Sequence, residues 1–215
     1  MDLVDELDVV TPDSLGQFVH RWYGLPDRPP GNQSLPHGLP APLVNWYRVA
    51  QRRSIPLSRD HTLRPAERLR LDEPMVAFWD GEVDAYAYAS GPQDPWVFER
   101  GEGGAWLPTG VPLSRFLVYV AVYEAVYAPL HGLVRLSMPA GEMAGVTRRL
   151  RELADPLWRW PDPALRYYAD DDLLAHAGIT EDRTGRVVLA ARHRDALGRF
   201  DGLGIAWDWD SRTVT

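Results

Sequence analysis

Residues 75–96, MVAFWDGEVDAYAYASGPQDPW, decide the fold that this sequence predicts. Apolar side chains alternate with polar or aromatic ones on both sides of Asp80-Gly81, a dipeptide typical of two-residue hairpin turns. A two-residue turn fixes the register of the strands that flank it, so Trp79 should pair with Glu82. The sequence therefore predicts an antiparallel hairpin, and the prolines after it predict a corner at Asp94-Pro95-Trp96.

The predicted register gives the hairpin two unlike faces, because directly paired residues share a face. One face is apolar and small enough to lie under a helix, and it comprises Val76, Phe78, Val83, Ala85 and Ala87. The other face carries aromatic and acidic side chains, namely Trp79, Glu82, Asp84, Tyr86 and Tyr88. Two interpretations of this second face are open. Its rings pack against another layer, with the acids at a solvated edge, or the face binds a partner, since Tyr and Trp concentrate at hot spots and acids attract a basic protein.

Composition narrows the class of protein. A chain of 215 residues with 45% hydrophobic side chains suits one domain, or one domain with a sizeable extension, around a real core. The absence of cysteine excludes disulfides, thiolate metal sites and a cysteine nucleophile. The N-terminal stretch MDLVDELDVVTPD carries five acids and no base, unlike a secretory or transit segment, so we expect a cytoplasmic protein.

Charge and hydropathy also limit the partners. The longest apolar run, from Phe116 to Val126, is far shorter than the roughly 20 residues that span a bilayer, so it predicts a buried helix and no membrane partner. A net charge of -7 argues against direct nucleic-acid binding, which requires a positive surface. The seven arginines from Arg48 to Arg70 form either a basic patch or a solvated helix face and loop.

The order of predicted elements indicates an α+β fold. Helices are expected from Thr11 to Tyr23, with Thr11 as N-cap, and from Leu43 to Arg52. After the hairpin we expect a strand at 96–99, a short piece near Trp106, a helix at 114–127, strands at 133–138, 186–192 and 203–209, helices at 141–153 and 195–200, and extended segments at 165–168 and 173–176. This order predicts a two-layer fold in which helices flank a mostly antiparallel sheet.

The predicted domain organisation has two parts. Residues 1–130 are expected to form the core, with two N-terminal helices, antiparallel strands and a central helix. Residues 131–215 are expected to form an α+β extension packed on that core, which either continues its sheet or makes a second small unit.

Four motifs in order give the sequence a family resemblance. They are LPAPLVNWYRVAQRR, FWDGEVDAYAYASGPQDPWVFER, the lone Trp106, and PLSRFLVYVAVYEAVY. Over roughly residues 36–128 this order resembles the SUKH superfamily, with a departure at Asp80, where the family often has an Asn-Gln pair before the glycine. The resemblance implies a bacterial immunity protein that binds and neutralises a cognate polymorphic toxin, often a nuclease, or a cellular regulatory scaffold. It also implies contact through the open hairpin face and the Asp94-Pro95-Trp96 corner, and it transfers no catalytic residue.

Motifs for enzymatic chemistry are weak. The six histidines are scattered without an HExxH pattern, and no serine lies in a GxSxG elbow. The run Asp170-Asp171-Asp172, with Asp208 and Asp210, is the best candidate for a carboxylate cluster that binds a hard cation. The same acids are alternatively a solvated turn, or part of a negative surface that meets a basic toxin.

These observations predict a non-enzymatic immunity protein that occludes a cognate toxin domain, such as a basic nuclease, without a cofactor, a metal or a catalytic residue. The predicted contact residues are Trp79, Glu82, Asp84, Tyr86, Tyr88, Asp94, Trp96, Asp170, Asp171 and Asp172. The alternatives are a metal-dependent hydrolase that uses the aspartate run and a regulatory scaffold for other proteins.

Overall fold

The computed structural model describes residues 2–9, 11, 13–31, 34–59, 62–71, 73–80, 84–89, 93–154, 164–179 and 184–213, with only the backbone of Asp84 described. The chain divides into two compact units. Unit 1 comprises Met1–Val9 and Ala125–Thr215, and unit 2 comprises Val10–Glu124. The expected division after residue 130 thus differs from the structure, in which the first nine residues cluster with the C-terminal part.

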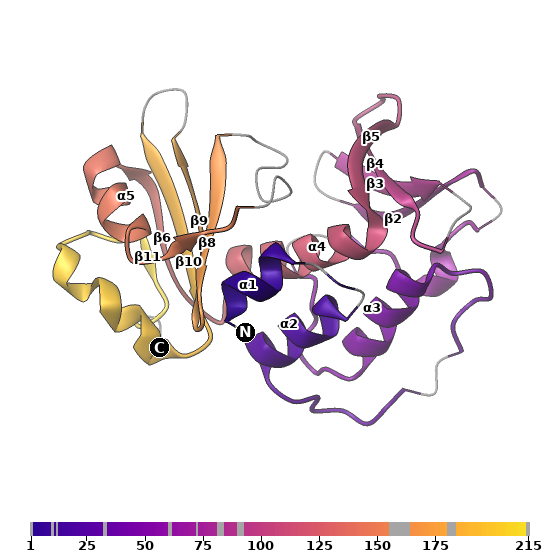
Figure 1. Ribbon diagram of the computed structural model, residues 1–215, viewed down its shortest axis with the longest axis horizontal. Helices are drawn as coiled ribbons and strands as arrows, with labels where there is room; N and C mark the ends of the chain where they lie inside the picture. Colours follow the sequence, from indigo (N-terminus) through magenta and orange to yellow (C-terminus); the bar gives the residue numbers. More distant parts are fainter. Residues whose placement is uncertain are drawn as a thin grey trace. The chain divides into compact units, whose positions relative to one another are not determined.

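Unit 2 combines an antiparallel meander with helices (Figure 1). Its strands are β1 (Thr62–Leu63), β2 (Met75–Asp80), β3 (Asp84–Ala89), β4 (Trp96–Gly101) and β5 (Leu107–Pro112), ordered β1-β2-β3-β4-β5 in the sheet. Its helices are α2 (Ser14–Tyr23), α3 (Ala41–Gln51), the short 3-10 helix η1 (Ala66–Arg68), and α4 (Leu113–Tyr127), whose last turn clusters with unit 1.

Local sequence explains helix α3 well and the start of α2 less well. In α3 the predicted apolar stripe of Leu43, Trp46 and Tyr47 is buried, as helical spacing requires. Helix α2 begins at Ser14, three residues after the expected N-cap Thr11. The backbone N–H of Thr11 donates to Ser14 Oγ at 2.7 Å, so Thr11 is held in the preceding turn and does not cap the helix.

The hairpin register differs from the predicted one. Trp79 pairs with Tyr86 and Val76 with Tyr88, and a β-bulge lies between Ala77 and Trp79. Asp80 is the last residue of β2 and pairs with Thr62 of β1, so it is not a turn residue. The predicted pairing of Trp79 with Glu82 is therefore wrong.

Asp80 stays in the strand because of an ion pair. Arg64 Nε donates to Asp80 Oδ2 at 2.7 Å and Arg64 Nη2 donates to Oδ1 at 2.9 Å, a two-pronged geometry that fixes both groups. The hydrogen bonds that Arg64 donates to the Asp80 carboxylate raise the pKa of Arg64. Residues 81–83, where the two-residue turn was expected, lie outside the described residues.

The aromatic face of the hairpin packs inward, against α4. Trp79 is 2% exposed, Tyr86 5% and Tyr88 2%. The ring of Phe116 in α4 lies 5.5 Å from that of Trp79 and 5.1 Å from that of Tyr86, centroid to centroid. The bulge lets the neighbouring residues Phe78 and Trp79 both enter this buried layer. The aromatic side chains of the predicted contact face are therefore core residues.

Helix α4 is a buried helix whose one acid is used structurally. Glu124 is 0% exposed, and its carboxylate accepts a hydrogen bond from the backbone N–H of Arg59 at 2.6 Å. Ser58 Oγ donates to the same carboxylate at 3.4 Å. A buried carboxylate is tolerated when hydrogen bonds satisfy it. These hydrogen bonds link the loop after α3 to helix α4. No helix among the described residues is long and apolar enough to cross a bilayer.

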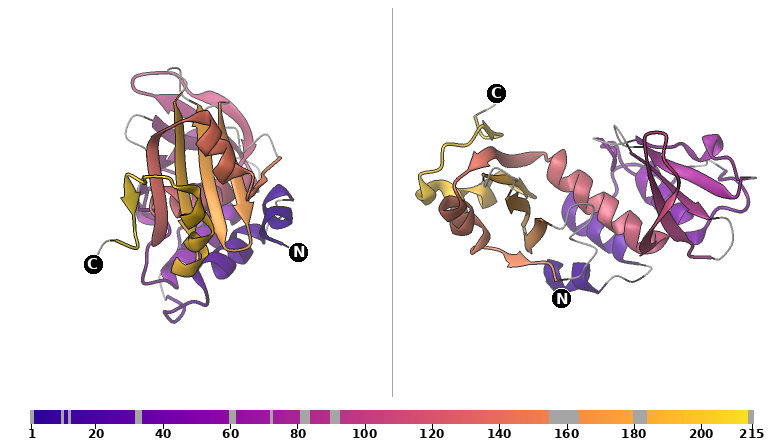
Figure 2. Two further views of the ribbon diagram at one scale, coloured as in Figure 1. Left: turned by 90° about the vertical axis from the view of Figure 1, so that its left-hand side faces the viewer. Right: turned by 90° about the horizontal axis from the view of Figure 1, so that it is seen from above.

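Unit 1 contains a second sheet, of order β11-β6-β10-β9-β8-β7. Its elements are α1 (Leu3–Asp8), β6 (His131–Met138), α5 (Ala140–Thr147), β7 (Arg151–Glu152), β8 (Leu165–Asp170), β9 (Leu173–Ile179), β10 (Gly185–Ala191), the 3-10 helix η3 (Arg194–Leu203) and β11 (Trp209–Asp210). Figure 2 (left) shows α5 and η3 on one face of the strands, where Val146, Leu197 and Phe200 join the buried residues of the sheet. The C-terminal part thus forms its own sheet, and the predicted α+β class is confirmed.

Three elements of unit 1 differ from expectation. The helix predicted over 141–153 ends at Thr147, and the strand predicted over 203–209 is limited to β11. Helix α1 was not predicted, because it is stabilised by residues far along the chain. Arg151 forms ion pairs with Asp2, at 3.2 Å, and with Asp5, and Asp8 accepts the backbone N–H of Ala154 at 3.0 Å.

A glycine pair tests the packing of unit 1. A Cβ added at Gly132 would lie 2.5 Å from the carbonyl oxygen of Leu189, whereas one added at Gly141 in α5 has nothing within 4 Å. We expect Gly132→Ala to lower the free energy of unfolding by about 1 to 3 kcal/mol through overpacking. The control Gly141→Ala should leave it unchanged or raise it by up to about 1 kcal/mol. Urea unfolding measures both, and equal midpoints would contradict the described packing.

Candidate functional site

At the Asp94-Pro95-Trp96 corner, Asp94 has a structural role and Trp96 is exposed. The Asp94 carboxylate accepts the backbone N–H of Ser114 at 2.9 Å and the hydroxyl of Ser114 at 2.7 Å. It therefore satisfies donors in the first turn of α4 from a position 20 residues earlier in the chain. Trp96, in contrast, is 56% exposed. Of the acids predicted on the hairpin, Glu82 lies outside the described residues, and for Asp84 only the backbone is described.

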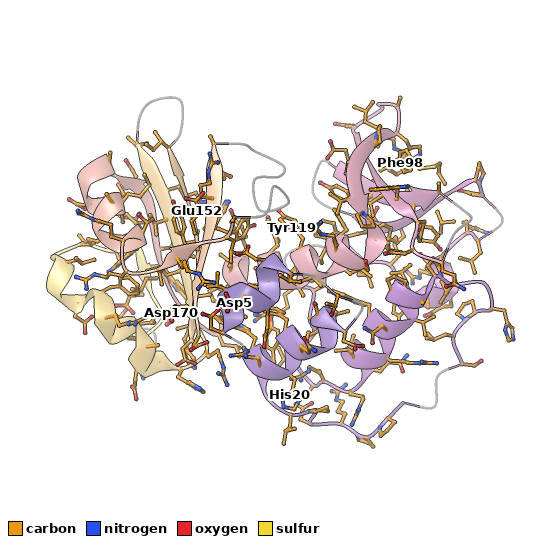
Figure 3. All side chains as sticks on the ribbon, viewed as in Figure 1. Asp5, His20, Phe98, Tyr119, Glu152 and Asp170 are labelled. Carbon is orange, nitrogen blue, oxygen red and sulfur yellow. The ribbon has the colours of Figure 1, made fainter. Side chains whose placement is uncertain are left out.

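The aspartate run does not form a cluster, because each carboxylate has a different partner. Asp170, labelled in Figure 3, forms an ion pair with Arg199, whose hydrogen bond lowers the pKa of Asp170. Asp171 accepts the backbone N–H of Leu3 at 3.3 Å, and Asp172 pairs with Arg192 at 3.1 Å. Within the described part of the chain, no group of three or more His, Cys, Asp or Glu could hold a metal ion.

The two other candidate acids are also paired. Asp208 accepts from Arg135 at 2.8 Å and from the backbone N–H of Leu136 at 2.7 Å. Asp210 accepts from Arg212, and this hydrogen bond lowers the pKa of Asp210. These acids hold β6 and the C-terminal segment of unit 1 in place, so they do not converge with the aspartate run on one site.

The face of the unit 2 sheet opposite the aromatic core is the surface left for a partner. Register places on it the outer-face residues Met75, Ala77, Ala85, Ala87, Ala89, Trp96, Phe98 and Arg100. Ala87 pairs with Phe98 and Ala85 with Arg100, so alternate residues of β2, β3 and β4 share this outer face. All of them except Ala87 are partly or largely exposed.

The outer face combines a flat floor with aromatic anchors. Its alanine side chains are small enough to let a partner approach the strands closely, and the register places Trp96 and Phe98 of β4 on the same face. Phe98 is labelled in Figure 3. Arg100 lies over the ring of Trp106, 4.2 Å from its centroid, in a cation–π contact. Tryptophan and arginine are the residue types that most often dominate the binding energy of a protein interface.

The β5 edge of this sheet is unsuited to strand addition. Edge strand β5 contains Pro108 and Pro112, which have no N–H to donate, and Gly110 with φ of 74°. The hydroxyl of Thr109 donates back to the carbonyl of Val97 at 2.8 Å. A partner that binds unit 2 at the sheet is therefore expected to use the outer face and not the edge.

Sequence reasoning missed Phe98 and the alanines as site residues. The alternation of Trp96, Phe98 and Arg100 with Val97 and Glu99 indicates a two-faced strand by itself. It could not show which face is exposed, because that depends on which face packs against α4.

Comparison of the chain with protein-family models, with curated proteins and with solved structures finds no match. The family resemblance therefore stays an expectation, and the function has to be argued from the geometry of the chain itself.

Replacement of Asp94 tests its structural role. Asp94→Ala removes two hydrogen bonds from the first turn of α4 and should lower the free energy of unfolding by about 1 to 2 kcal/mol. The control is Glu102→Ala, which removes an exposed acid that has no hydrogen bond or ion pair with any described residue. Urea unfolding measures both variants. A loss of partner binding in Asp94→Ala with unchanged stability would instead make Asp94 a contact residue.

Alkaline unfolding tests the burial of Tyr88. Burial raises the pKa of its hydroxyl from 10.0 to about 12. The unfolded chain loses this proton first, so the stability due to Tyr88 is complete below pH 10 and disappears as the pH rises to about 12. We expect the urea midpoint to fall across this window, and to fall less steeply in Tyr88→Phe. Identical pH profiles would show that Tyr88 is not buried.

Proposed function

We propose that this chain is a non-enzymatic immunity protein, which neutralises a cognate bacterial toxin domain by covering it with the outer face of the unit 2 sheet. The observation that carries the proposal is the exposed Trp96 beside Phe98 on a floor of alanines. Large rigid rings next to small side chains give a partner a deep contact at low cost in side-chain entropy. The proposed partner is still a toxin domain, but it contacts the outer face of the hairpin and not the face of Trp79, Tyr86 and Tyr88.

The motifs that resemble the SUKH superfamily support the fold part of the proposal. Phe78 and Trp79 pack on Phe116, and Asp94 is hydrogen-bonded to Ser114. The strand, the Asp-Pro corner and the Leu-Ser-x-Phe-Leu helix start thus contact one another in unit 2. A shared motif order is then expected to reflect shared packing, while the contact residues are free to vary with the toxin.

Charge supports a basic partner. The chain has a net charge of -7, which favours encounter with a positively charged protein such as a nuclease domain. Many individual acids form ion pairs with arginines. The electrostatic attraction to a basic partner therefore comes from the net charge of the whole molecule and not from one acidic patch. We therefore expect association with the toxin to slow as the salt concentration rises.

No observation favours the metal-dependent hydrolase. The carboxylates of the aspartate run are directed to separate partners, and each of the two flanking acids has an arginine within 3.1 Å. A regulatory scaffold would use the same outer face, and it differs from an immunity protein only in its partner.

Co-expression tests the proposal. Each toxin domain encoded beside the gene is expressed with the chain, and growth is measured. Wild type should rescue growth against one of them, and the purified pair should bind stoichiometrically. Trp96→Asp should weaken binding by roughly 30-fold or more, as expected for an interface anchor.

The matched control is Leu136→Asp, which places the same charge at an exposed apolar residue of β6 in unit 1. It should bind the toxin as wild type does, with far-ultraviolet circular dichroism confirming that both variants are folded. Rescue that persists in Trp96→Asp, or no rescue against any neighbouring toxin, would contradict the proposal. A partner that is not a toxin and that still requires Trp96 would replace it with the scaffold function.

A further inference from the structure

A cavity of about 590 Å³ lies in unit 2 between α3 and the inner side of the β2–β3 hairpin. Val44, Asn45 and Arg48 line it from α3, and Val76 and Tyr88 line it from the two strands. Because Val76 and Tyr88 pair on the inner face, this cavity is on the side of the sheet opposite the outer face. It is therefore independent of the proposed toxin contact.

Helix α3 has two stripes with different roles. Leu43, Trp46 and Tyr47 form the buried stripe that packs in the core. Ala41, Val44, Asn45 and Arg48 recur at helical spacing and form the second stripe, which faces the cavity. The cavity thus has a wall of regular structure, which is the kind of rigid support that a binding site requires.

The polar side chains that line the cavity have no partner among the residues that the structure describes. The hydroxyl of Tyr88 is buried and has no hydrogen-bond partner within the described residues. A buried hydroxyl without a partner is costly, and each one in a native protein needs an explanation. Arg48, Asn45 and Gln93 line the same space, and none of their side chains has a hydrogen bond or ion pair with a described residue.

The N-terminus of α3 contributes partial positive charge to the cavity. Its N-cap is Pro40, which makes no side-chain cap bond, and Pro42 has no N–H. The first helical hydrogen bond runs from the N–H of Val44 to the carbonyl of Pro40 at 3.1 Å. The N–H groups of Ala41 and Leu43 therefore have no acceptor within the helix, and the helix dipole adds partial positive charge there.

The charge of the lining selects the sign of the ligand. Arg48 supplies a full positive charge, and none of the described residues that line the cavity is an acid. The rest of the lining includes apolar side chains, among them Leu39, Val44, Leu71 and Val76. Such a site favours an anionic group at the arginine and an apolar body beyond it.

We propose that this cavity binds a small organic acid, whose carboxylate pairs with Arg48 and whose apolar body lies between Val44 and Val76. The carboxamides of Asn45 and Gln93 and the hydroxyl of Tyr88 provide the remaining hydrogen bonds. The site adds a ligand-binding function to unit 2 that does not depend on toxin neutralisation.

Calorimetric titration with 4-phenylbutanoate and with its neutral amide, 4-phenylbutanamide, tests the proposal on the full chain. The carboxylate should bind about tenfold more tightly than the amide, because only it forms a charge-assisted pair. Arg48→Gln should remove this difference by weakening carboxylate binding about tenfold with little effect on the amide. Val44→Trp, which fills the cavity, should abolish binding of both probes.

Arg149→Gln is the matched control, since Arg149 is an exposed arginine of unit 1 and its loss changes the net charge equally. It should bind both probes as wild type does. The exposed position of Arg48 keeps that variant folded, so the test does not depend on Val44→Trp. Equal affinities for the two probes, binding that survives Arg48→Gln unchanged, or no binding of either probe would overturn the proposal.

Discussion

Unit 2 depends on the contact between the aromatic face of the β2–β3 hairpin and Phe116 of α4. The rings of Trp79 and Tyr86 are tilted to each other with centroids 4.9 Å apart, and both contact the ring of Phe116. Aromatic rings of this size dominate the burial of apolar area, and their edge and tilted contacts add to it. Once these rings are inside, the small residues of β2 and β3 have to face outward. The same contact thus fixes the core and defines the surface that is left for a partner.

The acidic side chains of unit 1 have structural roles. Asp170 pairs with Arg199 of η3, and Asp172 pairs with Arg192, which follows β10. Asp171 accepts a hydrogen bond from the backbone N–H of Leu3, in the first turn of α1. Ion pairs at the surface contribute little to stability one at a time, but they specify which segments meet. The negative charge of the chain is therefore a property of its whole surface, and the acidic run is part of the framework.

The sequence was sufficient where structure is local. Helix α3, strand β4, the glycine turn after it and helix α4 follow from periodicity and turn residues, and they lie close to the predicted positions. The sequence was insufficient where the conformation of a segment depends on a residue far away in the chain. Arg64 keeps Asp80 in a strand, Arg151 holds α1, and Asp94 caps a helix that begins 19 residues later, none of which a single sequence displays. The site followed the same rule, since packing of the aromatic face against Phe116 of α4 left the opposite face exposed.

The central claim is that Trp96 is exposed on the outer face while the hairpin aromatics are sealed against α4. Hydroxyl-radical footprinting of the free chain, read by mass spectrometry, tests it directly. We predict heavy oxidation of Trp96 and almost none of Trp79, Tyr86 and Tyr88. Heavy oxidation of those three residues with protection of Trp96 would contradict it.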